Sequence, residues 1–335
     1  MHTLVSLVKH RGFITSTITD HKTIIDDSTV YIHRDADTIA ITISSKRKTK
    51  DSVEKLHFEI LYIMFLILGS FPLIVSIHLD NTEKDLQELV GMYASAPEYY
   101  KTPYRLGRIE KDCISQKSID AMQKINQDAL LSFAYIKSQG YVGVVANHKT
   151  TLLFHVIEGI STLTKQEIKS LNQGLIKKYS IPANQQPGEY MAIVYDLTKK
   201  YFFGYHREYN CEILQQLNCN QKLFLQTISD TRNQYSHLRI SKNHSLNDGR
   251  VMQFYNEIVS LMIRLNVLER LSISVDTDNI KELLYSIRDW IVETKYGECK
   301  DPKSISYINQ KQLADLSKTL RNLNGNGSAE DEGMN

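Results

Sequence analysis

Short stretches in which apolar and polar residues alternate dominate the first fifty residues. FITSTITDHKTII (13–25), STVYIHR (28–34) and TIAITIS (38–44) are rich in Thr, Ile, Val and Tyr, and Asp- or Lys-containing turns separate them. A period of two places every second side chain on one face of a sheet, and β-branched and aromatic residues favour strands. The pattern therefore predicts a β-rich N-terminal region.

The longest apolar run, ILYIMFLILGSFPLIVSI (60–77), has no charged residue and approaches the length of a membrane-spanning helix. Gly-Ser-Phe-Pro (69–72) interrupts it, and this sequence is typical of a turn. We therefore expect a buried helix over about 53–68, then a turn, and a buried strand over 72–78. The alternative is a membrane span, which would suit a membrane-attached sensor.

From residue 118 onward the apolar period becomes that of helices. SIDAMQKINQDALLSFAYIKSQ (118–139) predicts one helix, and TKQEIKSLNQGLIKKYS (164–180) predicts another that begins with a capping box. The apolar face expected on the first helix consists of Ile119, Met122, Ile125, Ala129 and Leu130. Further helical patterns occupy 150–163, 190–209, 211–218, 220–238, 251–273 and 279–297, and a last one 308–323.

The predicted fold class is α+β, with a small β-rich domain before an all-α helical bundle. We place the α+β N-terminal domain at 1–114 and assign it a sensing or regulatory role. The all-α domain follows at 115–323, because long helices with short connections form bundles. The polar end of the chain, 324–335, is expected to be disordered.

Composition is ordinary for a globular protein of 335 residues, with 42% hydrophobic and 23% charged residues. The net charge of +2 does not point to a nucleic-acid partner, but 12 Lys/Arg against 7 Asp/Glu between Ser161 and Arg250 would suit a polyanionic substrate or a basic solvated face. The four cysteines form no C-x-x-C pair, and no signal peptide is evident. We therefore expect a cytoplasmic protein with no membrane partner.

Several common site motifs do not occur in the sequence. There is no glycine-rich phosphate loop, no H-E-x-x-H, no G-x-S-x-G, and no carboxylate group with two-metal spacing. We therefore expect neither a cofactor nor a bound metal, and nucleotide-driven or metal-driven hydrolysis becomes less favoured.

One stretch does carry candidate chemistry, DTRNQYSHLR (230–239). Histidine exchanges protons near neutral pH, and a guanidinium stabilises charge on phosphoryl oxygens, so Arg232 and His237 would suit RNA cleavage without a metal. The two residues are about 140° apart around a helix, whereas Asn233 and His237 share a face. The spacing alone favours an ordinary surface helix or a capped helix start over a catalytic pair.

TRNQYSH, followed by a polar loop and the apolar VMQFYNEIVSLMIRLNVLERLSI, resembles the R-N-x-x-x-H signature of the HEPN superfamily. Within it, the arrangement is similar to the Apea-like HEPN proteins of bacterial anti-phage defence, which have a β-containing domain before the helical one. LLFHVIEGI (152–160) resembles their upstream apolar helix through Glu158. The resemblance covers residues 152–274 well and the N-terminal part only in outline.

This resemblance implies a helical bundle that forms a homodimer and brings two R-x4-H motifs together as a metal-independent endoribonuclease. It implies tRNA or other host RNA as substrate, an abortive defence against phage, and a phage-encoded trigger. Arg232 and His237 match the catalytic pair, Asn233 the polar position after the arginine, and Glu158 the upstream acid. The alternative is a non-catalytic HEPN-like dimer that binds RNA or protein.

Three further residues are candidate RNA contacts. Tyr235 would stack on a base or pack in the bundle, and Arg239 and Lys242 would contact phosphates or lie in a solvated loop. His155, beside Glu158, is either a bundle histidine with its own partner or a second base.

Overall fold

The computed structural model assigns the chain to two compact units. Unit 1 comprises residues 1–144 and 264–280, and unit 2 comprises 145–263 and 281–335. The predicted domain boundary at 114 stays a prediction. The residues that the structure describes are 1–9, 18–35, 38–46, 48–69, 72–84, 105–138, 146–181, 188–203, 221–237, 249–280 and 282–283.

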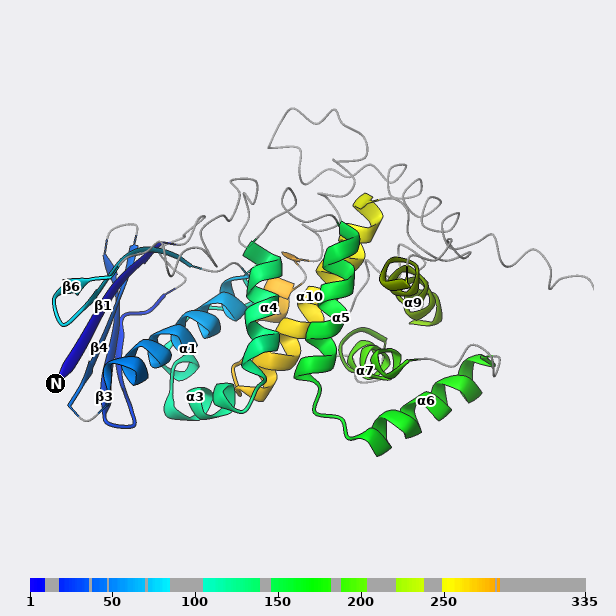
Figure 1. Ribbon diagram of the computed structural model, residues 1–335, viewed down its shortest axis with the longest axis horizontal. Coiled ribbons are helices and arrows are strands. Elements are labelled where there is room, and N and C mark those ends of the chain that lie inside the picture. The colour runs from blue at the N-terminus through cyan, green and yellow to red at the C-terminus, as the bar shows by residue number, and fades with distance from the viewer. Residues whose placement is uncertain are drawn as a thin grey trace, which may run out of the picture. The chain divides into compact units, whose positions relative to one another are not determined.

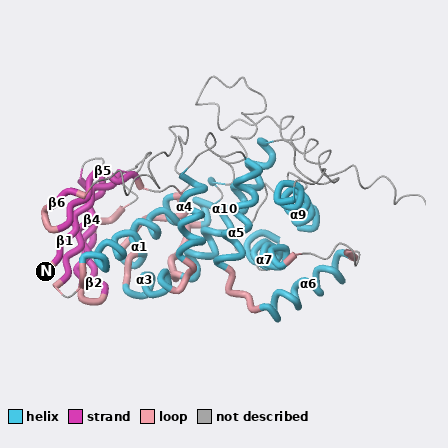
Figure 2. Tube along the Cα trace, viewed as in Figure 1, coloured by secondary structure: helices cyan, strands magenta, loops and turns pink. Residues whose placement is uncertain are grey.

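Unit 1 contains an antiparallel sheet of six strands in the order β2-β3-β4-β1-β5-β6 (Figure 2). The strands are β1 His2–Lys9, β2 His21–Ile25, β3 Ser28–Asp35, β4 Thr38–Ser45, β5 Leu73–Leu79 and β6 Thr82–Glu83. The β-rich N-terminal region is confirmed. The sequence patterns did not predict β1, which nevertheless lies inside the sheet between β4 and β5.

Helix α1 (Lys50–Leu68) and strand β5 confirm the division of the long apolar run. Thr49 caps the start of α1 by accepting a hydrogen bond from the backbone N–H of Ser52, at 3.3 Å. Gly69 ends the helix with φ 86°, a left-handed conformation that glycine adopts without strain, and its N–H donates to the carbonyl of Phe65 at 2.7 Å. Among the described residues, no helix has the length and apolar character needed to cross a membrane.

The apolar character of α1 is explained by its burial against the sheet. The helix contacts β1 and β4 (Figure 1), whose inward side chains, among them Leu4 and Ile41, have no exposed surface. Its C-terminal turn is held by a second group, the buried guanidinium of Arg264. That side chain donates from Nε to the carbonyl of Leu66 at 2.8 Å and from Nη2 to that of Ile67 at 3.0 Å.

The helix predicted over 118–139 is two helices, α3 (Gln116–Gln123) and α4 (Gln127–Ser138). The side chain of Asn126 accepts hydrogen bonds from the backbone N–H groups of Asp128 and Ala129, at 3.0 and 3.2 Å. Asparagine at this position starts a new helix instead of continuing the old one. All five residues of the predicted apolar face are buried.

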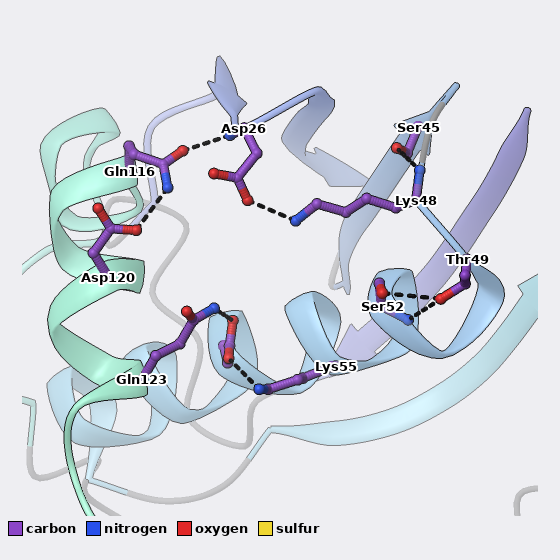
Figure 3. Close-up of polar contacts among 10 residues, drawn as sticks. Asp26, Ser45, Lys48, Thr49, Ser52, Lys55, Gln116, Asp120 and Gln123 are labelled. Atoms are coloured by element: carbon purple, nitrogen blue, oxygen red, sulfur yellow. Dashed lines mark hydrogen bonds and ion pairs between the residues drawn. The ribbon is translucent and has the colours of Figure 1, made fainter.

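A polar network joins the β2–β3 turn to α1 and α3 (Figure 3). Lys48 Nζ pairs with Asp26 Oδ2 at 2.7 Å, and the backbone N–H of Asp26 donates to Gln116 Oε1. Gln123 Nε2 donates to Glu59 Oε2 at 3.3 Å, and burial raises the pKa of that carboxyl group. These contacts fix α3 beside the sheet edge.

Unit 2 is helical. Its helices are α5 Ala146–Ile160, α6 Lys165–Tyr179, α7 Glu189–Thr198 with a π-helical continuation Lys199–Phe203, α9 Gln221–His237 and α10 Gly249–Arg270, which passes into unit 1 at Arg264. The capping box predicted for α6 is confirmed, with Thr164 and Glu167 bonding each other's backbone. The predicted helix 308–323 and tail 324–335 lie outside the described residues.

Candidate active site

The R-N-x-x-x-H motif forms the last six residues of α9, and His237 is the final residue of that helix. Helix α9 contacts α5 and α7 within unit 2. The described side chains of the motif are those of Arg232, Asn233 and Gln234, all partly exposed. The side chains of Tyr235 and His237, and the whole of Arg239 and Lys242, lie outside the described residues, so their predicted roles stay predictions.

The guanidinium of Arg232 lies over an aromatic ring. Its Cζ is 4.4 Å from the ring centroid of Tyr190, the second residue of α7. A guanidinium over a ring face is held by the ring's negative quadrupole, with a contribution of about 0.5–2 kcal/mol. The long side chain of Arg232 therefore has a preferred position beside α7.

Tyr190 is itself fixed on several sides. Only 3% of its surface is exposed, its hydroxyl shares a 2.8 Å hydrogen bond with Ser229 Oγ, and Phe154 of α5 packs edge-on at 5.3 Å between ring centroids. Burial raises the pKa of Tyr190, although Ser229, the charge of Arg232 and a hydrogen bond with Asn233 act in the opposite direction. The phenol therefore stays protonated near neutral pH and is a support for Arg232, not a base.

Three residues of α9 meet the same tyrosine. Ser229, Arg232 and Asn233 have the spacing i, i+3 and i+4, which places them side by side on one helix face. The side chain of Asn233, the polar residue of the motif, lowers the pKa of the same tyrosine whose ring lies under the predicted catalytic arginine. The structure brings these two predicted site residues together through Tyr190.

Glu158 does not join this group among the described contacts. Its carboxylate pairs with Nδ1 of His155 at 3.7 Å, with 36% of the Glu158 side chain and 62% of the His155 side chain exposed. An exposed pair of this kind contributes little to stability. His155 is an exposed residue and not a buried bundle histidine, and the catalytic role of Glu158 stays a prediction.

A small cavity lies between α5, α9 and α10, on the buried side of the motif. It has room for about one water molecule. Within it, Thr150 Oγ1 donates to Asn256 Oδ1 at 2.8 Å, a buried hydrogen bond between α5 and α10. The cavity is far too small for a nucleotide. Its lining residues are Thr150, Leu153, Phe154, Ile228, Thr231, Tyr255, Asn256 and Val259.

The model of the Apea-like HEPN family matches residues 158–277. The chain contains an Apea-like HEPN domain. The match includes the motif of α9 and the apolar helix α10 that follows it. HEPN domains belong to an RNA-related superfamily in which ribonucleases are common. No curated protein and no solved structure shows a significant match to the chain.

Sequence reasoning missed the contacts of Tyr190 with Ser229 and Arg232. Tyr190 lies 42 positions before Arg232 and belongs to no recognised motif. The one available signal was a tyrosine at the start of an apolar helix, which is equally common in ordinary cores. In the part of the chain that the structure describes, no three His, Cys, Asp or Glu residues are grouped closely enough to hold a metal ion.

Proposed function

We propose that this protein is an endoribonuclease whose active centre is built from the Arg232 and His237 of two chains. The observation that carries the proposal is the fixed guanidinium of Arg232, 4.4 Å above Tyr190, in the R-N-x-x-x-H motif of an Apea-like HEPN domain. A cation that is held before substrate arrives can stabilise charge on phosphoryl oxygens without reorganising.

The proposed reaction is the attack of a ribose 2′-oxygen on the adjacent phosphorus. His237 of one copy removes the 2′-OH proton, the new O–P bond forms, and the P–O5′ bond breaks. His237 of the second copy protonates the departing 5′-oxygen. Arg232 holds the negative charge that builds on the non-bridging oxygens, so the products are a 2′,3′-cyclic phosphate and a 5′-hydroxyl end.

Two histidines are needed for this acid–base pair, and each chain brings one R-x4-H motif. A homodimer places two motifs opposite each other across a two-fold axis. We propose that host RNA, with tRNA as the first candidate, is cut in the cytoplasm during phage infection, and that the N-terminal unit senses a phage-encoded trigger.

The test compares wild type with Arg232→Ala and His237→Ala, and with Arg108→Ala and His148→Ala as controls on exposed residues. Purified proteins are incubated with total RNA, and 5′-hydroxyl ends are sequenced. Cleavage by wild type and the two controls, with about a 100-fold loss in the motif variants, is the expected result. Equal RNA integrity with all five proteins would refute catalysis.

Two further measurements examine the chemistry and the assembly. EDTA should leave the cleavage rate unchanged. Loss of cleavage in EDTA would show that a metal takes part. RNA binding that persists without any cleavage in wild type would favour a non-catalytic HEPN-like dimer. Dilution below the dimer dissociation constant should abolish activity in proportion to the monomer fraction.

A further inference from the structure

The sheet of unit 1 has one face that no described helix covers (Figure 1). In β1 the side chains of Leu4, Ser6 and Val8 point to the core and are fully buried, whereas those of Val5 and Leu7, pointing the other way, are partly exposed. We call this second side of the sheet the open face.

One row of residues crosses the open face from strand to strand. The register pairs Lys22 with Tyr31, Tyr31 with Thr42, Thr42 with Val5, and Val5 with His78. Five neighbouring strands, about 4.8 Å apart, give this row a length of about 19 Å. The row therefore offers a continuous platform and not an isolated side chain.

The second residue of the row is an aromatic ring with an accessible surface. Tyr31 is 40% exposed and stacks on His33, with 4.8 Å between ring centroids and 21° between planes. A strand holds its side chains upright, and the stacked neighbour further limits the motion of Tyr31. Exposed aromatic rings of this kind are the surfaces on which unpaired bases stack.

The charge of the open face suits a polyanion. Strands β1, β2 and β4 contain no acidic residue, and Lys22 is exposed beside Tyr31. Acidic residues belong to the margins of the sheet, where Asp35 ends β3 and Glu83 of β6 is the register partner of His78. Hydroxyl side chains such as Thr29, Thr42 and Ser44 occupy much of the remaining face.

We propose that the open face binds single-stranded RNA, with one base stacked on Tyr31 and a phosphate bound by Lys22. The stacking ring, the adjacent cation and the absence of acids in three strands together favour this ligand over a protein. The inference rests on the proposed function only for the choice of RNA over DNA, since binding at this face does not require cleavage.

The binding test uses the full chain with His237→Ala, which prevents cleavage, and fluorescein-labelled oligouridine. Tyr31→Ala should weaken binding by about tenfold, since one base–aromatic stack accounts for about 5- to 150-fold in affinity. Tyr31→Phe should restore it. The matched control is Tyr135→Ala, because Tyr135 of α4 is 44% exposed and should not affect binding.

The charge test uses Lys22→Gln, with Lys117→Gln of α3 as control, because Lys117 is also exposed. Loss of one phosphate contact should reduce the slope of log affinity against log salt by about 0.7 for a single strand. Thermal melting of every variant checks that the sheet remains folded. An unlabelled DNA oligomer and duplex RNA are used as competitors, and single-stranded RNA should compete best.

Unchanged affinity in folded Tyr31→Ala, or no oligouridine binding by the parent, overturns the inference. In that case the exposed side chains of Ile24 and Val75, 70% and 44% exposed, point to a protein partner instead. RNA binding that depends on Tyr31, in a protein whose wild type cuts no RNA, would refute the proposed nuclease and support the open face. RNA cleavage by wild type, together with an RNA affinity that does not depend on Tyr31, would support the proposed nuclease and refute RNA binding at the open face.

Discussion

Replacing Tyr190 with leucine removes the ring beneath the Arg232 guanidinium and leaves the arginine itself in place. In the folded protein the guanidinium lies 4.4 Å from the ring centroid, and the tyrosine is 3% exposed. If Arg232 stabilises the transition state, loss of this support should lower cleavage although no motif residue has changed.

The expected magnitude follows from the contact. A cation–π contribution of about 0.5–2 kcal/mol corresponds to a 2- to 30-fold preference for the held position. Without it, that position is populated less by the same factor, so kcat should fall by about 2- to 30-fold. KM should change less, because an arginine that acts on developing charge contributes mainly in the transition state.

The matched variant is Tyr190→Phe, which keeps the ring and removes only the hydroxyl that bonds Ser229. It should retain most of the activity and lose about 1 kcal/mol of stability. Cleavage is measured under single-turnover conditions with a tRNA substrate, and urea unfolding confirms that both variants are folded. Wild-type kcat in folded Tyr190→Leu would refute the support role, and an equal loss in both variants would assign it to the hydroxyl.

Three other changes test the fold. Burial lowers the pKa of His57 to about 3, below its value of 6.5 in the unfolded chain. Between these pH values the unfolded chain binds more protons than the folded chain, so the free energy of unfolding must fall as pH falls. Between about pH 7 and 4.5 the loss should be about 2.5 kcal/mol in urea unfolding, and His57→Leu should remove this part of the pH dependence. Arg264→Met should lower the free energy of unfolding by about 2–4 kcal/mol in the same measurement, because two carbonyls of α1 lose a charged donor. Arg108→Met, at an exposed position, should change it little. Thr164→Ala should destabilise by about 1 kcal/mol, Thr164→Ser should not, and an unchanged unfolding curve for the alanine variant would contradict the capping role.

The elements predicted correctly from the sequence carried local signals. Gly69 and the proline after it divided the apolar run, and Thr164 with Glu167 marked the start of α6. Asn126 was overlooked because an asparagine inside an apolar period is a weak signal until its side chain is seen to cap the next helix. Strand β1 was missed because its apolar residues lie on both faces and partly obscure the alternation.

The contacts that could not be predicted join residues far apart in the chain. Arg264 reaches the end of α1 across 198 positions, and the apolar period of α10 gave no indication that this arginine would be buried. Likewise the motif named Arg232 and Asn233, but their common partner Tyr190 belongs to another helix. Local patterns identify helices and motifs, whereas the partners of a buried or half-buried charge are set by tertiary packing.

Tyr190 is also relevant to the angular separation of Arg232 and His237 around α9, which does not by itself place the two side chains together. Arg232 and His237 are about 140° apart around an ideal helix, whereas Asn233 and His237 are only about 40° apart. Tyr190 lies beside Arg232 and interacts with Asn233, and Asn233 is the motif residue that shares a helix face with His237. One chain thus has one arginine and one histidine of the motif in the last turns of α9. The proposed acid–base cleavage needs a second proton-transfer group, and in our proposal that group comes from the same helix end of a second copy.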